Sequence, residues 1–463
     1  MRRHVILSVL SLAGTLVIGC ASLEERKAFE EHAAAARTSY VSADRSYGRQ
    51  DLPVLNEESA LSDYLAYAAL NNPGLEATFN RWKAALERIP QARSLPDPRF
   101  NYAYFIREVE TRVGPQEQKV GIAQMFPWFG KLELRGDIAL EAANAERQRY
   151  EAAKLKLFHR VKKAYYEYYY FGRAMSITEE NVQLLSDLEA VARTKYTAGA
   201  PTYAAMIKAQ VELGKLEDRL LTLRDIVSPV VAELNAAMNR RSNAPIPVPQ
   251  AIPEDDVAFS NEQLFASLKE GNPELRAADF MAAKDKAAID LAKKDRFPDI
   301  TVGLEYIDTD SALMPDTRDS SKDPVVGMLS INLPIWRDKY RAAEREARAR
   351  YEAALTERED RENNLVAKLQ MALYGFREAE RKIDLYRDAL IPKANQSFEV
   401  TQQAYETGKA DFLDLIDAQR VLLEFKLSHE RALSNRAQKL AEIEMLVGRE
   451  VPRIVEADSA TDG

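Results

Sequence analysis

Residues 196–213 read YTAGAPTYAAMIKAQVEL, and residues 405–422 read YETGKADFLDLIDAQRVL. The two stretches share a tyrosine, a glycine three positions later, an aromatic residue and an Ala-Gln pair. Each shared position lies 209 residues from its counterpart. The chain therefore contains an internal repeat, and its fold is to be read as two related halves.

Three further pairs of short motifs occur in the same order in both halves. They are Asn72-Pro73 with Asn272-Pro273, Pro96-Asp97 with Pro298-Asp299, and Phe126-Pro127-Trp128 with Leu333-Pro334-Ile335-Trp336. We predict a first repeat at residues 57–242 and a second at 262–448. A stiff, proline-rich linker at 243–261 separates them. An N-terminal segment at 20–56 precedes the repeats, and a polar tail at 449–463, expected to be disordered, follows them.

Residues 1–19 predict a signal peptide, because two arginines precede an apolar run that ends in small residues at Cys20. The run is too short to span a membrane comfortably. It resembles a bacterial lipoprotein signal, which implies that Cys20 carries lipid such as palmitate. The alanine at position 21 then favours the outer membrane. The alternative is an ordinary secretory signal followed by an incidental cysteine. Since Cys20 is the only cysteine, a structural disulfide is excluded.

The charge balance of the chain argues against nucleic acid as a partner. The formal net charge is −8, and removal of residues 1–19 takes away two arginines and leaves about −10. A phosphate-binding surface needs net or locally clustered positive charge. After Cys20, no apolar run approaches the length of a membrane-spanning helix.

Each repeat contains two stretches in which apolar residues alternate with others, as half-buried strands require. In the first repeat they lie at about 99–107 and 119–126, and in the second at about 299–307 and 325–333. A polar loop separates the two stretches of each pair. The sequence therefore predicts one β-hairpin per repeat.

A long helix follows each predicted hairpin. Residues 128–199 contain no proline and are rich in good helix formers, so an unbroken helix there would be roughly 105 Å long. Residues 336–408 repeat the pattern, and Pro392 is expected to kink that helix or mark a joint. Gly199 and Gly408 are placed to end these helices in a left-handed conformation. Returning helices are then expected from residue 203 and from residue 412.

Four strands cannot close a barrel, and strands that face lipid must have every backbone group bonded internally. The sequence therefore predicts an obligate ring of several chains.

Taken together, the Cys20 signal, the doubled Asn-Pro and Tyr-x-x-Gly motifs and the segment 125–131 (MFPWFGK) resemble the TolC-type outer-membrane efflux family over about residues 57–448. The resemblance implies a mainly α-helical fold with a small β part. Long antiparallel helical hairpins would form a trimeric α-barrel, and four strands per chain would build a twelve-stranded transmembrane β-barrel. It also implies a lipid-anchored protein of the bacterial outer membrane that extends into the periplasm. Its expected partners are two further copies, a periplasmic adaptor, an inner-membrane pump of the RND type, and outer-membrane lipid.

The resemblance also implies roles for residues at the periplasmic end. Asp414 and Asp417 match positions that line the pore constriction, and residues three apart share one face of a helix. Their counterparts in the first repeat are Ala205 and Lys208, so the acidic ring would be three-fold. The alternative is a solvated helix face. Asp411 would join the ring or cap the helix.

The predicted turns at Gly199, Gly408 and Lys409 match the region where the adaptor docks. The family's basic latch residue is replaced by Ala410, so whether the tip is latched as in the family stays open.

Nothing in the sequence indicates an enzyme or a cofactor. The four histidines lack metal-ligand spacing, and neither a phosphate loop nor a catalytic triad is present. We expect a channel that conducts metal cations or drugs from the pump to the exterior. The alternatives are a type I protein secretion channel, or a periplasmic coiled-coil adaptor or scaffold lipoprotein without a pore.

Overall fold

A computed structural model describes residues 54–197, 203–252 and 257–453. The predicted signal peptide, Cys20 and Gly199 lie outside these residues. The chain divides into two compact units. Among the described residues, the sheet unit comprises Arg81–Arg147 and Ala277–Arg358. The tip unit comprises the remainder, mainly Gln148–Arg276 and the residues from Glu359 onward.

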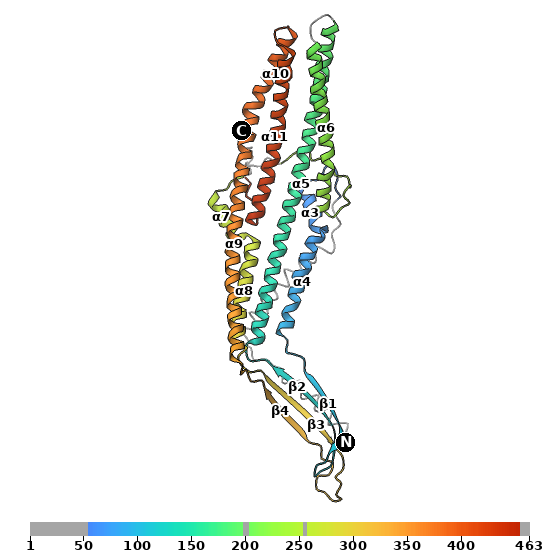
Figure 1. Ribbon diagram of the computed structural model, residues 1–463, viewed down its shortest axis with the longest axis vertical. Helices are drawn as coiled ribbons and strands as arrows, with labels where there is room; N and C mark the ends of the chain where they lie inside the picture. Colours follow the sequence, from blue (N-terminus) through green and yellow to red (C-terminus); the bar gives the residue numbers. More distant parts are fainter. Residues whose placement is uncertain (1–53, 198–202, 253–256, 454–463) are drawn as a thin grey trace, which may run out of the picture. The chain divides into compact units, whose positions relative to one another are not determined.

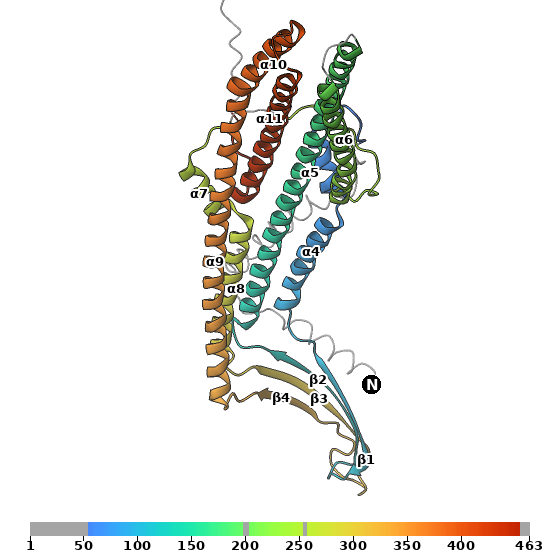
Figure 2. The same cartoon turned by 45° about the horizontal axis from the view of Figure 1, so that its top comes forward.

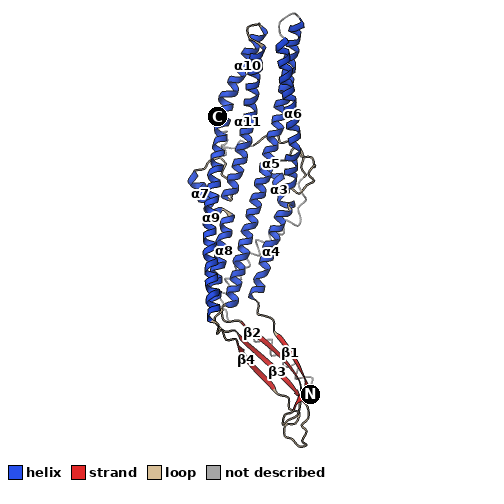
Figure 3. Ribbon diagram, in the orientation of Figure 1, coloured by secondary structure: helices blue, strands red, loops and turns tan. Residues whose placement is uncertain are grey.

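The two halves of the chain have the same order of elements (Figures 1 and 3). The first half contains α3 (Leu61–Asn71), α4 (Pro73–Arg93), β1 (Arg99–Val109), β2 (Gln116–Phe126), α5 (Lys131–Thr197) and α6 (Tyr203–Ala237). The second contains α7 (Asn261–Gly271), α8 (Pro273–Lys294), β3 (Ile300–Thr309), β4 (Val325–Ile331), α9 (Arg337–Asp384), the π-helix η2 (Leu385–Leu390), α10 (Ile391–Glu406) and α11 (Phe412–Val447). The predicted fold class, mainly helical with four strands, is confirmed.

Each Asn-Pro motif separates two helices, α3 from α4 in the first half and α7 from α8 in the second. The side-chain oxygen of Asn72 accepts from the Leu75 N–H at 3.0 Å and caps α4, while its amide donates to the Ala237 carbonyl at 2.8 Å. Asn272 caps α8 in the same way and donates to the Leu446 carbonyl at 2.8 Å. The proline that follows occupies the first helical position, where no N–H is needed. The motif is therefore a joint that fastens the short helices to the ends of α6 and α11.

The four strands form one antiparallel sheet in the order β1-β2-β3-β4. The two hairpins join through β2 and β3, which pair from Gln116 opposite Thr309 to Phe126 opposite Ile300. Strands β1 and β4 are the two edges, and within the described chain each has a strand partner on one side only. The sheet has open edges in the single chain.

The long helices differ at Pro392. Helix α5 runs for 67 residues without proline, whereas its counterpart is divided into α9, η2 and α10. The Ile391 N–H bonds to the Tyr386 carbonyl, five residues earlier, immediately before Pro392. Such a π-turn accommodates a proline, which lacks an N–H and would clash with the carbonyl four residues before it. The predicted joint is present.

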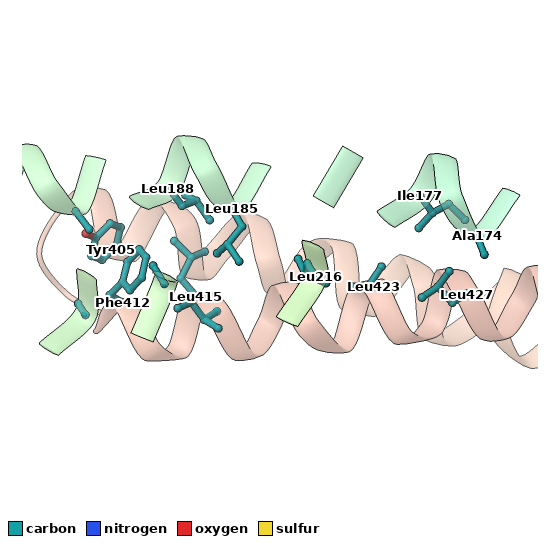
Figure 4. Packing of buried hydrophobic residues seen from close by; sticks show 14 of the residues in the cluster. Ala174, Ile177, Leu185, Leu188, Leu216, Tyr405, Phe412, Leu415, Leu423 and Leu427 are labelled. Atoms are coloured by element: carbon teal, nitrogen blue, oxygen red, sulfur yellow. The ribbon is translucent and has the colours of Figure 1, made fainter. Parts of the chain in front are cut away.

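In the tip unit, α6 runs back along α5, and α11 runs back along α10 (Figures 1 and 2). A hydrophobic cluster joins these helices and includes Leu185, Leu188, Leu415 and Leu423 (Figure 4). A second cluster packs α7 and the start of α8 against α9 and α11. Within the described residues, no helix has the length and apolar character needed to cross a membrane.

Candidate functional site

The turn between α10 and α11 is built on Gly408. Its φ of +74° is left-handed, and a Cβ at this position would meet nothing within 4 Å. The Lys409 N–H donates to the Ala404 carbonyl at 2.7 Å, which closes the end of α10. The helix α10 therefore ends at the predicted position, just before the left-handed Gly408. Lys409 itself is exposed, and Ala410 is partly buried.

Asp411 and Asp414 form a reciprocal cap at the start of α11. The Asp411 carboxylate accepts from the Phe412 N–H at 2.6 Å, and the Asp414 carboxylate accepts from the Asp411 N–H at 3.2 Å. This is a capping box, which satisfies free N–H groups at a helix start. The capping alternative for Asp411 is therefore the one that the structure shows. Asp414 is exposed and one of its oxygens is held by this box.

Asp417 is exposed and lies beside a positive charge. The Arg420 guanidinium is 3.3 Å from the Asp417 carboxylate and 2.9 Å from the Glu212 carboxylate of α6. The Lys215 hydrogen bond, and then the Arg420 charge, hold the pKa of Glu212 below its ordinary value. Arg420 thus joins the two repeats and offsets part of the local negative charge. The sequence analysis did not single out Arg420, although it directly follows the second Ala-Gln pair.

Lys195, near the end of α5, holds the second repeat at Tyr405. Its ammonium donates to the Tyr405 carbonyl at 3.1 Å and lies 3.9 Å from the centre of the Tyr405 ring. The ring packs on Phe412 with centroids 5.3 Å apart. Burial, and to a smaller extent the charge of Asp411, raise the pKa of Tyr405. The basic residue that contacts this turn is therefore Lys195 from the other repeat. Position 410, where the family has a basic residue, holds alanine.

The glutamines of the doubled Ala-Gln motif both bind α5. Gln419 is buried and donates to Asn181 at 2.7 Å. Its counterpart Gln210 is exposed and donates to Glu189 at 3.0 Å. The motif therefore ties each returning helix to the same long helix.

The sheet has two chemically different faces. Directly opposed residues in neighbouring strands point to the same side of a sheet. The register therefore defines one face, here called the apolar face, that crosses all four strands. This apolar face includes Phe100 and Tyr102 of β1, Val120 and Ile122 of β2, Val302 and Leu304 of β3, and Val325, Leu329 and Ile331 of β4. All nine side chains are exposed.

The opposite face of the sheet is mixed: it combines small and charged residues with Val326 and Met328 of β4, which lie opposite Glu305 and Gly303. It carries Gly121 and Ala123 opposite Glu305 and Gly303. An ion pair of 3.0 Å joins Lys119 to Glu305 on this face. A strand that faces lipid on one side and water on the other needs an apolar face toward the lipid and can carry charged residues on the other face.

Among residues 54–197, 203–252 and 257–453, no group of three or more His, Cys, Asp or Glu side chains is placed to hold a metal ion. The candidate site is therefore the helical tip together with the two-faced sheet.

A family model described as outer membrane efflux protein matches residues 65–240 and again residues 264–449. The chain is 23% identical over 424 residues to the cobalt-zinc-cadmium resistance protein CzcC of Cupriavidus metallidurans, covering 89% of this chain and 96% of that protein. It is 21% identical over 414 residues to nodulation protein T of Rhizobium leguminosarum bv. trifolii, covering 84% and 85%. The solved structure of the outer membrane protein VceC from Vibrio cholerae matches with a TM-score of 0.70 at 17% identity, covering 84% of this chain and 96% of that one.

Proposed function

The chain belongs to the outer membrane efflux protein family, and from this premise we propose that it is the outer-membrane channel of a tripartite efflux system. Three copies close a twelve-stranded barrel and a helical tunnel. A periplasmic adaptor and an inner-membrane pump of the RND type deliver the cargo. The channel carries it to the exterior, and the protein has no enzymatic activity.

The observation that carries this proposal is the two-faced sheet with its open edges. An apolar face this wide, exposed in the single chain, needs lipid or another protein against it. Its two edges leave unpaired backbone groups that lipid cannot satisfy. Pairing between copies satisfies the edges and places the apolar face against lipid. An adaptor or scaffold without a pore gives no reason for such a sheet.

Asp414 and Asp417 are the proposed pore constriction. Six carboxylates around one axis favour cations and resist close approach unless they are paired or protonated. Arg420 lies beside Asp417 and moderates that repulsion. The turns at Gly199, Gly408 and Lys409 are the proposed adaptor contacts, and Cys20 is the proposed lipid anchor in the outer membrane.

Metal cations are the proposed cargo class. The similarity to CzcC supports this, because that protein is described as a cobalt-zinc-cadmium resistance protein and is matched over 96% of its length. The acidic pair at the proposed constriction is compatible with cation passage.

Conductance measurements test the proposal. The full-length protein, extracted in detergent and incorporated into planar bilayers, is expected to form cation-selective pores. Asp414→Asn with Asp417→Asn should lower the cation preference severalfold, whereas Asp225→Asn, an exposed acid farther along α6, should leave it unchanged. Protein that stays monomeric and soluble without detergent would contradict the channel function. Unchanged selectivity in the double variant would contradict only the role of the two carboxylates.

A further inference from the structure

Four side chains link the end of β2 to the start of β3, and we call this set the lock: Trp128, Lys131, Phe297 and Asp299. The buried Lys131 ammonium is 2.8 Å from the Asp299 carboxylate, which also accepts from the Trp128 N–H at 2.8 Å. The Trp128 ring stacks on Phe297, with centroids 5.4 Å apart and planes 10° from parallel. Residues from the first repeat thus bind the Phe-Pro-Asp segment that opens the second hairpin.

The chain contains the parts of a second such lock, but they do not meet. Trp336 and Lys339 have the spacing of Trp128 and Lys131, and in both copies the lysine N–H bonds to the tryptophan carbonyl at 3.0 Å. Leu95 and Asp97 occupy the positions of Phe297 and Asp299. Trp336 is 73% exposed, and both Lys339 and Asp97 are exposed. Neither forms an ion pair within the described part of the chain.

These unmatched parts lie at the two open edges of the sheet. Trp336 and Lys339 follow β4, and Leu95 and Asp97 precede β1. In the complete lock, the corresponding parts follow β2 and precede β3, which are paired. A second copy of the same chain, with its β1 beside β4, would bring these two sets of residues together.

We propose that β4 of one copy pairs with β1 of the next in a register copied from β2 and β3. Gln124 lies opposite Val302 and Ile122 opposite Leu304 in that pair. Alignment of the repeats on Pro127 and Pro334 maps these onto Ile331 opposite Phe100 and Leu329 opposite Tyr102. One extra residue, Ile335, then lies between this proline and Trp336, so the register is taken from the strand and the lock follows one residue later. Lys339 then binds Asp97 of the next copy, and Trp336 packs on its Leu95.

The apolar face independently supports this register. A shift by one residue would set the apolar face of β4 against the other face of β1, which carries Asn101 and Ala103, because side chains alternate along a strand. With Leu329 opposite Tyr102, the apolar face continues across the seam between copies. Val325 then lies opposite Ile106, and both side chains are exposed in the single chain.

The proposed lock is a looser copy of the one within the chain. Lys131 also lies 3.7 Å from Asp295. The residue that corresponds to Asp295 in the first repeat is a cation, Arg93, which lies 3.6 Å from Asp137. Gly130 has a left-handed φ of +76°, but the matching Asp338 already belongs to α9. A seam that is weaker than the internal junction follows from these differences.

Disulfide trapping tests the register, which rests on the proposed ring. Directly opposed strand residues have Cα atoms about 4.5–5.5 Å apart, within the range that a disulfide spans. Full-length Leu329→Cys/Tyr102→Cys, oxidised in outer-membrane preparations, should give cross-linked oligomers at least tenfold in excess of Leu329→Cys/Ile106→Cys. In the second pair the cysteines would be about 13 Å apart along the strand. Single-cysteine variants report any background from Cys20.

A charge exchange tests the lock itself. Asp97→Lys and Lys339→Asp should each lower the fraction of SDS-resistant oligomer severalfold, and the double exchange should restore most of it. A purely structural role for either residue predicts additive losses, and additivity would overturn the pairing. If amine cross-linking of the unaltered protein gives only monomer, both the proposed channel and this seam are wrong. An oligomer that forms without preference between the two cysteine pairs overturns the register alone.

Discussion

The helices α6 and α11 begin with the same sequence pattern but bury different faces. Helix α11 buries Phe412, Leu415 and Ile416 almost completely. The counterparts of Phe412 and Ile416 in α6 are Tyr203 and Ile207, which are 56% and 40% exposed. In the second repeat, these apolar side chains are therefore buried against other residues of the chain. In the first repeat, their counterparts are exposed.

The difference follows from the neighbours of each helix. Phe412 packs on Tyr405, whose position is fixed by Lys195 from the other repeat. The Tyr203 ring lies against the Tyr196 ring with centroids 5.5 Å apart, and both rings are exposed. The start of α11 in the second repeat is thus held within the chain and carries carboxylates, whereas the start of α6 in the first repeat leaves apolar side chains exposed.

The largest expected effect separates the two helices directly. Phe412→Ala removes a ring that is 1% exposed and should lower the stability of the tip by about 3–5 kcal/mol. Tyr203→Ala should lower it by less than about 1 kcal/mol, because the ring is already half in solvent. Hydrogen–deuterium exchange of α6 and α11 peptides in the detergent-extracted protein measures both. Equal losses would mean that assembly covers the α6 face as fully as α11 is covered.

A smaller effect is expected at the two Ala-Gln glutamines. Gln419→Ala leaves the buried Asn181 oxygen without its donor, which should cost about 1–3 kcal/mol. Gln210→Ala loses a part-buried contact to Glu189, whose carboxylate keeps Arg193 as a second partner, and should cost about 0.5 kcal/mol. Exchange rates of the α5 amides near residue 181 report the difference. A loss at Gln210 as large as that at Gln419 would contradict the asymmetry.

The sequence predicted the elements of this comparison but not their contacts. Alternating residues located the strands, and the glycine at 408 and the absence of proline in α5 located the turn and the long helix. Lys195 and Arg420 escaped prediction because their partners, Tyr405 and Glu212, are about 210 residues away and belong to the other repeat. The joints at the Asn-Pro motifs could not be predicted from the sequence either, since the bonds that define them reach the ends of α6 and α11.

Lys195 offers a way to loosen the held tip without touching its core. Lys195→Met keeps the aliphatic stem but removes the hydrogen bond to the Tyr405 carbonyl and the contact with its ring, which should cost about 1 kcal/mol. The opening equilibrium of the tip should shift about fivefold, and protease cleavage near Gly408 should accelerate accordingly. Lys208→Met, an exposed lysine of α6, is the matched control. Equal cleavage rates for both variants would show that Lys195 does not hold the tip.

The smallest expected effect concerns the link between α6 and α11 through Glu212 and Arg420. The hydrogen bond from Lys215 and the charge of Arg420 lower the folded-state pKa of Glu212 below its ordinary value of 4.5. A group with a depressed folded pKa contributes stability that is fully present above the unfolded pKa and is lost as the pH falls through the folded one. Exchange protection of α11 near Arg420 should therefore decline as the pH drops below about 4.5. Glu212→Gln should show less protection at pH 6 and a shallower decline, whereas Glu217→Gln, an exposed acid on the same helix, should follow the unaltered protein. If Glu212→Gln shows the same decline, other carboxylates control the acid response, and the bridge between the repeats contributes nothing measurable to the held tip.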